Sequence, residues 1–458
     1  MSDQAPSHAG GKAAPVSFEK RVPQLRELCR TLWPHAMHDK TVFEPELNHD
    51  LNLHYPVRLT YEGQEEEPKR VVIQIPYDDQ SVEKYAQNLQ YLDKFPEIRD
   101  LVPKVLQFDT TRENPLHRPY LVRGWIPGKP LTELYNKMSQ EHKVLVAAEL
   151  GRTWYRLEEV CGLYSGYPVP AQEGEKFVED DEFAPQFKSM IKIRPFGLVE
   201  DQYKDKLGWD QIRDSIIPQG EDRHKDQVLH RFNLLEDEPA MTARKILLLT
   251  FERRIQRNRH WALRTYENTD LEPALEIVRD IVNKECNAAS FPRKEFEIGL
   301  HNPDLLGVPE NIVVDFDGEG KPVITGLADW HSTEWAPRFL RCQPPTWLWT
   351  PGAVHDSENP KPETKDYPKD EEGNYQPKTE PLDLVMPVDD AGFAVKRAFD
   401  DAAGECFQTD AYNPDVVFAR RYFAVACQQQ WQVCDGKELE YLAREWAGRK
   451  ARCTCGRA

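Results

Sequence analysis

Two neighbouring stretches carry the clearest signature of this chain: LHNPDLLGVPENIVVD at residues 300–315 and ITGLADW at residues 324–330. Each stretch contains a short apolar run with polar residues beside it. The polar residues of most interest are Asp304 and Asn311 in the first stretch and Asp329 in the second. Two carboxylates and one amide beside strand ends can serve the chemistry of metals and phosphates.

A β-hairpin is predicted between these polar residues. Residues 312–315 and 323–327 are rich in Val and Ile, and the glycine-containing segment 316–321, FDGEGK, can turn the chain between them. Because the two strands of a hairpin run in opposite directions, the residue before the first strand meets the residues after the second. We therefore expect Asn311 and Asp329 at the same end of the hairpin.

These residue types suit phosphoryl transfer. The reaction needs a carboxylate that orients an acceptor hydroxyl and accepts its proton, and it needs oxygen ligands for Mg²⁺. Asp304 suits the first role, while Asn311 offers a neutral amide oxygen and Asp329 a charged oxygen to a metal ion. Taken one at a time, each residue also has a purely structural alternative, because Asp and Asn commonly cap and turn chains.

In this order the residues resemble the aminoglycoside phosphotransferase and choline kinase-like family, particularly its fungal members. The matching positions are His301–Asp304, Asn311 and Ala328–Trp330. The resemblance implies that Asp304 is the catalytic base, that Asn311 and Asp329 are metal ligands, and that ATP and Mg²⁺ are the cofactors. It also implies an α+β, bilobal protein kinase-like fold with a small β-rich N-lobe and a larger, mostly helical C-lobe. Asn311 follows Asp304 by seven residues, a longer spacing than the family pattern has.

The domain organisation follows from this resemblance. We expect a disordered tail over residues 1–16, a nucleotide-covering lobe over residues 17–122 and a catalytic lobe over residues 123–458. Two segments, residues 165–245 and 351–384, are rich in charge and proline and are expected to be insertions.

The N-terminal lobe is expected to begin with a helix over residues 17–33, in which apolar residues recur at helical spacing. Residues 47–59 resemble the family's first two strands and the turn that covers the phosphates. This turn is normally glycine-rich, because glycine lets the backbone approach phosphates closely. Here polar residues occupy it, and Asn52 is the candidate nucleotide contact.

The next strand, residues 70–76, resembles the family strand that carries a phosphate-binding basic residue. Gln74 stands at that position. A glutamine can hydrogen-bond to a phosphate but cannot neutralise its charge. Lys69, Arg70 and Arg58 are candidates to supply the charge from displaced positions, although strand alternation places Lys69 on the opposite face. The helix after this strand is expected over residues 81–95.

A strand and hinge resembling those of the family follow at residues 118–128. The backbone near Val122 and Gly124 is the candidate contact for an adenine edge, which needs no particular side chain. Beyond the hinge, apolar periodicity predicts helices of the larger lobe over residues 131–134, 140–161, 240–265, 391–405 and 414–447. A tryptophan-rich group, Trp335, Trp347 and Trp349, either lines an acceptor pocket or fills the core.

The composition of the chain disfavours some classes of binding partner and some cellular locations. The chain of 458 residues has 77 acidic and 59 basic residues and a formal net charge of −18, which disfavours nucleic acid and anionic membranes as partners. No run approaches the roughly 20 apolar residues of a membrane-spanning helix. The nine cysteines are scattered and odd in number, which suits free thiols in a reducing compartment, so we expect a cytoplasmic protein.

The leading hypothesis is an ATP- and Mg²⁺-dependent phosphotransferase that acts on a hydroxyl of a small-molecule acceptor, with Asp304 as the catalytic base. The rival is a kinase-like binding or regulatory protein, a pseudokinase without turnover, which Gln74, the glycine-poor turn and the longer loop before Asn311 favour. Adenylyl transfer is a third hypothesis, because altered phosphate contacts could reverse the nucleotide. The acceptor is not encoded in any recognisable motif, since one fold hosts many acceptors.

Overall fold

The structure is a computed structural model, and it describes a defined part of the chain. The described residues are 18–44, 47–49, 52–63, 68–76, 81–162, 167–170, 191–194, 298–302, 305, 308–331, 333–354, 386–413, 416–417 and 420. The expected tail, most of both insertions, the helix predicted over residues 240–265, most of the helix predicted over residues 414–447 and Asp304 lie outside these residues.

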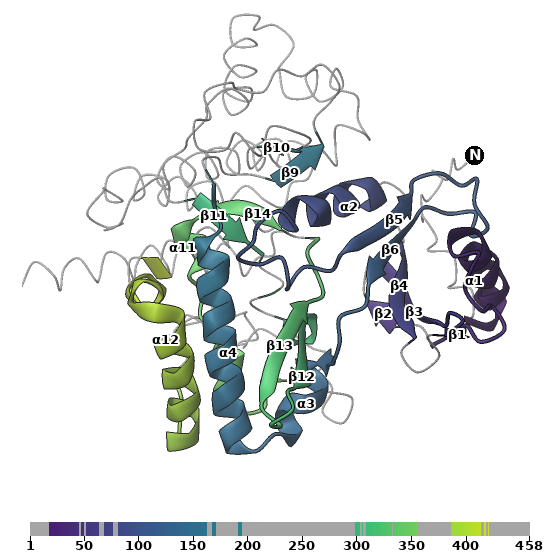
Figure 1. The fold of residues 1–458 in the computed structure, drawn as a ribbon. Coiled ribbons are helices and arrows are strands. Elements are labelled where there is room, and N and C mark those ends of the chain that lie inside the picture. The colour runs from purple at the N-terminus through teal and green to yellow at the C-terminus, as the bar shows by residue number, and fades with distance from the viewer. Residues whose placement is uncertain are drawn as a thin grey trace, which may run out of the picture. The chain divides into compact units, whose positions relative to one another are not determined.

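The chain divides into two compact units, each described here by itself. The first unit comprises residues 1–90 and 103–125, and the second comprises residues 91–102 and 126–458. The first unit contains a six-stranded antiparallel sheet with the order β1-β3-β4-β6-β5, in which β2 also pairs with β3 (Figure 1). The strands are β1 (Val42–Phe43), β2 (Leu47–His49), β3 (Asn52–Leu59), β4 (Lys69–Pro76), β5 (Val105–Asp109) and β6 (Tyr120–Gly124).

Helix α1 (Phe18–Leu32) lies where the sequence predicts a helix over residues 17–33. It packs on one face of this sheet. Its buried residues recur at three- and four-residue spacing, and Leu25 and Cys29 join Tyr55 and Ile73 of the sheet in one apolar core. Each fully buried Leu or Ile of this kind contributes roughly 1.5–3 kcal/mol to folding. Burial also raises the pKa of the Cys29 thiol to about 12, so this cysteine stays protonated.

Helix α2 (Ser81–Leu92) follows β4. It is three residues shorter than the helix predicted over residues 81–95, because the chain turns sharply after Leu92: the amide of Phe95 donates to the Leu92 carbonyl at 3.1 Å. Tyr85 of this helix is buried.

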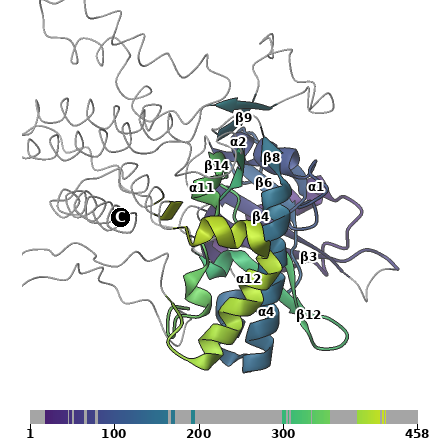
Figure 2. The same cartoon turned by 90° about the vertical axis from the view of Figure 1, so that its left-hand side faces the viewer.

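Two long helices, α4 (Gln140–Glu159) and α12 (Asp390–Ala411), lie side by side in the second unit (Figures 1 and 2). Gly151 permits the close approach, because a Cβ at this position would lie 2.8 Å from Ala402 Cβ and 3.0 Å from Ala403 N. Helix α12 is longer than the predicted helix over residues 391–405. It continues through a bend at Gly404, whose φ of 89° is one that glycine adopts without strain.

The short helix α3 (Leu131–Leu134) lies where the sequence predicts it, and two small sheets complete the framework of the second unit. Strand β12 pairs with β13 and with β7, and strand β11 pairs with β14 and with β8. These strands are β7 (Lys129–Pro130), β8 (Cys161–Gly162), β11 (Ile298–His301), β12 (Ile312–Phe316), β13 (Pro322–Leu327) and β14 (Glu334–Pro337). A separate pair joins β9 (Tyr167–Pro170) to β10 (Ile191–Arg194). The remaining short helices are η1 (Tyr135–Lys137), η4 (Pro309–Asn311), α11 (Arg338–Arg341) and η5 (Thr346–Leu348).

The three tryptophans considered for an acceptor pocket belong to the core instead. All three are buried, and each packs against a different aromatic residue. Trp335 contacts Phe95 at a ring distance of 5.7 Å, Trp347 contacts a tyrosine at 6.1 Å, and Trp349 contacts a phenylalanine at 6.3 Å. Their aromatic rings therefore fill separate parts of the interior, which is the usual role of large apolar side chains.

The described helices include no candidate for a membrane span. None of them combines the length and the apolar character needed to cross a lipid bilayer. Helix α12 is long enough, but charged residues recur along it.

Candidate functional site

The predicted hairpin is present in the second unit. Strand β12 runs antiparallel to β13, with Ile312 opposite Leu327 and Phe316 opposite Pro322. At the open end of the hairpin, the amide of Ala328 donates a hydrogen bond of 2.7 Å to the Asn311 carbonyl. The backbone of Asn311 therefore lies beside the residue that precedes Asp329, so the expected convergence of these two segments is confirmed.

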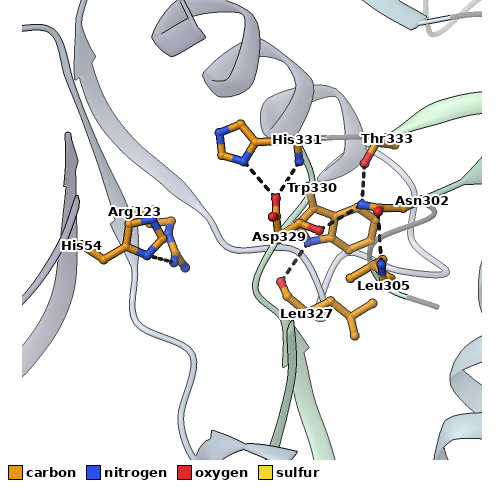
Figure 3. A network of polar contacts seen from close by, with 9 residues as sticks. All are labelled: His54, Arg123, Asn302, Leu305, Leu327, Asp329, Trp330, His331 and Thr333. Atoms are coloured by element: carbon orange, nitrogen blue, oxygen red, sulfur yellow. Dashed lines mark hydrogen bonds and ion pairs between the residues drawn. The ribbon is translucent and has the colours of Figure 1, made fainter. Parts of the chain in front are cut away.

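The turn that carries Asp329 is held by short local contacts (Figure 3). Asp329 Oδ1 accepts a hydrogen bond of 2.9 Å from the His331 amide and lies 2.9 Å from His331 Nδ1. Between them, the fully buried Trp330 donates from Nε1 to the Leu327 carbonyl at 2.9 Å. The buried indole and its hydrogen bond therefore fix the position of Asp329, which follows directly after the end of β13.

Asn302 ties the loop after β11 to this turn (Figure 3). Its Nδ2 donates to the Asp329 carbonyl at 2.9 Å and to Thr333 Oγ1 at 3.2 Å, and its Oδ1 accepts from the Leu305 amide at 3.2 Å. Asp304 lies outside the described residues, but it stands in the chain between Asn302 and Leu305, and both of these take part in the network. The described residues on either side of Asp304 in the chain thus meet the segments of Asn311 and Asp329.

Asn311 and Asp329 have the chemistry that a hard divalent cation requires. Asn311 is the last residue of the 3₁₀ helix η4 and is 5% exposed, whereas the Asp329 side chain is 37% exposed. Both printed contacts of Asp329 with His331 use Oδ1. An amide oxygen and a carboxylate oxygen fit Mg²⁺, which prefers oxygen ligands and keeps several waters. Within the described ranges, no cluster of three His, Cys, Asp or Glu side chains could hold a metal ion by itself.

His301 does not have the properties of a base. Burial, together with the positive charges of Arg341 and Arg420, lowers its pKa to about 3. The imidazole is therefore neutral at physiological pH and belongs to the support of the loop.

A second group of polar residues lies on one face of the six-stranded sheet in the first unit; this face is called the polar face below. Gln74 on β4 lies directly opposite His54 on β3, and Val72, two residues before Gln74, lies opposite Arg123 on β6. Directly opposite residues share a face of a sheet, as do residues two apart on one strand. His54, Gln74 and Arg123 therefore share the face opposite to α1, and Arg123 Nη2 lies 3.5 Å from His54 Nδ1 (Figure 3).

Gln74 is 2% exposed, and its Oε1 has no hydrogen-bond partner among the described residues. Arg58 and Arg70, which were candidates to compensate for the missing basic residue, both pair with Glu44 at 3.0 Å. Arg123 is the buried cation on the same face as Gln74. Sequence reasoning missed it, although counting alternate residues across aligned strands would have found it.

The remaining predicted nucleotide contacts lie in the same sheet. Asn52 begins β3 and pairs with His49 and Pro76. Val122 and Gly124 lie on β6, which has β4 on one side and β5 on the other. The amide of Gly124 donates to the Lys104 carbonyl at 2.8 Å, so this N–H is already engaged.

Asn302 is the other residue that the sequence analysis left without a role. It sits inside the quoted signature, and an Asn that directly follows a strand is a common loop organiser. Its partners Asp329 and Thr333 are 27 and 31 residues away, so only the fold reveals what it connects.

The sequence of the chain matches no known family model and no curated protein. Its structure is similar to those of a candidate aminoglycoside phosphotransferase from Ralstonia eutropha (9% identity, 93% of this chain and 98% of that chain covered, TM-score 0.41) and of a Plasmodium vivax ethanolamine kinase (10%, 89% and 82%, TM-score 0.35). A third similar structure is the GDP complex of aminoglycoside 2′-phosphotransferase-IIIa (12%, 92% and 97%, TM-score 0.37). These neighbours come from the family that the signature resembles. Because every TM-score is below 0.5, the proposal below rests on the residues of this chain.

Proposed function

We propose that the chain is a phosphotransferase that moves a phosphoryl group from ATP to a hydroxyl of a small molecule. The observation that carries the proposal is the network around Asn302 and the open end of the hairpin. It joins Asn302 and Leu305, which flank Asp304 in the chain, to the turn of Asp329 and to the backbone beside Asn311. These three residue types are the ones that the reaction needs.

Each residue has a distinct role in this proposal. Asp304 orients the acceptor hydroxyl and takes its proton as the oxygen forms a bond to phosphorus and the bond from phosphorus to ADP breaks. Asn311 and Asp329 are the residues that would hold Mg²⁺. The metal ion, when bound, would neutralise charge on the phosphates. Asn302 keeps the Asp304 segment in register with the Asp329 turn.

The sheet of the first unit carries the proposed nucleotide-binding surface. The proposed contacts are Asn52, Gln74 and the backbone near Val122 and Gly124, and Arg123 adds the positive charge that Gln74 lacks. Arginine pairs with phosphate through a planar fork and stays charged at all relevant pH values. The net charge of −18 supports a small-molecule acceptor rather than a nucleic acid.

Replacing Asp304 by Asn tests the function most directly. General-base catalysis typically contributes about 10²–10⁴-fold, so we expect Asp304→Asn to lower ADP production from ATP by a factor in this range, measured with a panel of small alcohols and amino alcohols. The nucleotide-dependent rise in melting temperature should remain.

Asp315→Asn is the matched control. Asp315 is an exposed carboxylate on β12 of the same hairpin, so its loss should change neither turnover nor nucleotide binding. Equal turnover in Asp304→Asn and the unmodified protein would refute the assignment of the base.

The alternative function is a kinase-like binding or regulatory protein without turnover. The observation that favours it is the buried Gln74 at the position of the basic residue, with an unsatisfied amide oxygen among the described residues. ATP should then raise the melting temperature equally with and without Mg²⁺, or not at all, and no acceptor should yield ADP. A rise that depends on Mg²⁺ supports the phosphotransferase, since a ligand stabilises only the folded state that binds it.

A further inference from the structure

A small cavity lies beside β11 in the second unit, next to the end of α4. Its volume is about 20 Å³, which is room for one water molecule or one single-atom ion and too little for a polyatomic ligand. Most of its lining is apolar, and the members with a charged side chain are Arg341 and Glu158. Any occupant of this cavity is therefore a single small species beside a guanidinium.

The guanidinium of Arg341, the last residue of α11, is buried. Arg341 is 3% exposed, and its Nε, Nη1 and Nη2 have no hydrogen-bond partner among the described residues. A guanidinium carries five N–H donors. Burying a charge without a partner is strongly unfavourable, so an anion that fits the cavity and reaches these donors would stabilise the folded chain.

The chain makes room for this guanidinium. A Cβ at Gly299 would overlap the Arg341 side chain and would lie 2.8 Å from the Val160 carbonyl oxygen. Only glycine fits at this position of β11 while Arg341 stays in place. The buried position of the charge is therefore built into the neighbouring strand.

A second positive charge acts on the same place. Arg420 is buried and donates to the carbonyls of Cys342 and Ala411 at 2.8 and 3.1 Å. The charges of Arg341 and Arg420 both lower the pKa of His301, which also lines the cavity and stays neutral.

The carboxylate of the described lining belongs to Glu158, which is only partly buried. Its Oε1 accepts a contact of 3.4 Å from Cys342 Sγ. Glu158 therefore keeps contact with solvent and with a thiol, whereas the charge of Arg341 lies inside the protein.

We propose that this cavity binds one chloride ion on the guanidinium of Arg341. A halide is a single atom little larger than a water molecule, so it suits a cavity that excludes carboxylic acids, sulfate and phosphate. A water molecule could accept a hydrogen bond from Arg341, but it could not neutralise the charge. In surroundings of low dielectric constant the attraction between an anion and a guanidinium is strong.

The ion would lie beside the loop after β11, because Asn302 and Leu305 also line the cavity. A bound chloride would therefore stabilise this loop together with the ends of α4 and α11. The inference does not depend on the proposed function, since binding of a halide needs neither ATP nor turnover.

Thermal unfolding of the full chain tests the proposal. In a chloride-free buffer, replacement of sodium gluconate by sodium chloride at constant ionic strength should raise the melting temperature in a saturable way, because the ion binds only the folded state. Sodium bromide should act similarly, and sodium acetate should not. The absence of a saturable rise with chloride, or an equal rise with acetate, would overturn the assignment.

Arg341→Met is the decisive variant. It should lose the chloride-dependent rise, and in gluconate its melting temperature should equal or exceed that of the unmodified protein, because an unpaired buried charge has been removed. A chloride-dependent rise that persists in Arg341→Met would reject the site. A lower melting temperature of this variant in gluconate would also reject it, since Arg341 would then have an internal partner.

Arg152→Met is the matched control. Arg152 is an exposed arginine on α4 that pairs with Glu149, so its loss should leave the chloride-dependent rise unchanged. Loss of the rise in this variant as well would show a general effect of surface charge and would contradict the site.

Glu158→Gln gives an independent reading if Arg341→Met does not fold. Like charges that line one small cavity repel each other, so removal of the carboxylate should increase the affinity for chloride at least about tenfold, which corresponds to about 1.4 kcal/mol. The width of the ³⁵Cl NMR line, measured with and without competing bromide, reports this affinity directly. An unchanged or weaker affinity contradicts the proposed position of the ion.

Discussion

The open end of the β12–β13 hairpin and the polar face of the six-stranded sheet differ in how their polar side chains are satisfied. At the hairpin end, Asn302 makes three hydrogen bonds of 2.9 to 3.2 Å within the protein. On the sheet face, the contact between Arg123 and His54 is 3.5 Å, and Gln74 Oε1 has no partner among the described residues. A fully connected network fixes its members in one geometry, whereas an incomplete one is suited to a partner from outside.

This contrast has a consequence for function. The turn of Asp329, a proposed metal ligand, is held in place before any ligand arrives, as efficient catalysis requires. On the proposed nucleotide surface, Arg123 of β6 and Gln74 of β4 share one face of the sheet, and the amide oxygen of Gln74 has no partner among the described residues. Changes at the hairpin end should therefore affect turnover more than changes on the sheet face.

The largest effect is expected for Asp329→Asn. Loss of the carboxylate should lower the rate of ADP production at least about 100-fold, above the range typical of residues that only orient a metal ligand. The Mg²⁺-dependent part of the ATP-induced rise in melting temperature should disappear, while any metal-independent part remains. Titration of Mg²⁺ at fixed ATP measures both. Unchanged turnover and unchanged Mg²⁺ affinity in Asp329→Asn would break the contrast.

Asn302→Ala comes next. It removes three hydrogen bonds and leaves buried partners unsatisfied, so the free energy of unfolding should fall by about 3 kcal/mol. Asn114 provides a matched control, because its amide makes a similar set of bonds to Asp109, Thr111, Arg118 and Leu116 in the first unit. Denaturant unfolding should show a loss in both alanine variants, and only Asn302→Ala should lower turnover. Equal loss of turnover in the two variants would show that Asn302 acts through general stability alone.

The buried His301 makes stability depend on pH. Its pKa is about 3 in the folded protein and about 6.5 in the unfolded chain. Between these values the unfolded chain binds a proton that the folded protein does not, so the free energy of unfolding should fall by about 1.4 kcal/mol per pH unit as the pH decreases below 6.5. His301→Gln should remove this slope relative to the unmodified protein. Parallel curves for the two proteins would contradict the burial of a neutral imidazole.

The smallest effect is expected for Gln74→Met. The two side chains have similar volumes, and the change removes an unsatisfied amide oxygen, so the free energy of unfolding should change by less than about 1 kcal/mol. The ATP-induced rise in melting temperature should shrink without vanishing, because Arg123 remains. A loss of nucleotide binding larger than that of Asp329→Asn would reverse the contrast between the two regions.

The sequence predicts regular elements well where local patterns determine them. The β-branched runs of β12 and β13 flank a glycine-containing turn, so the hairpin and the meeting of its flanking residues follow from local chemistry alone. Helix α1 follows in the same way from apolar residues at helical spacing.

The residues that the sequence did not reveal are those whose partners are distant in the chain. Arg123 is 49 residues from Gln74, and their shared face depends on the register of β4 and β6. The role of Asn302 likewise depends on the fold, which brings the Asp329 carbonyl to its side chain across 27 residues of chain. The tryptophans were ambiguous because burial in a core and stacking on a ligand use the same side chain, and only packing separates the two.

Among the described cysteine side chains, Cys29 of the first unit and Cys342 of the second are buried, and Cys406 is exposed. A protonated, buried thiol reacts with an alkylating reagent only when its surroundings open. The rate of modification at Cys29 therefore measures how often α1 separates from its sheet, and the rate at Cys342 measures openings beside α11. With the exposed Cys406 as a reference, the two rates compare the local stability around Cys29 with that around Cys342.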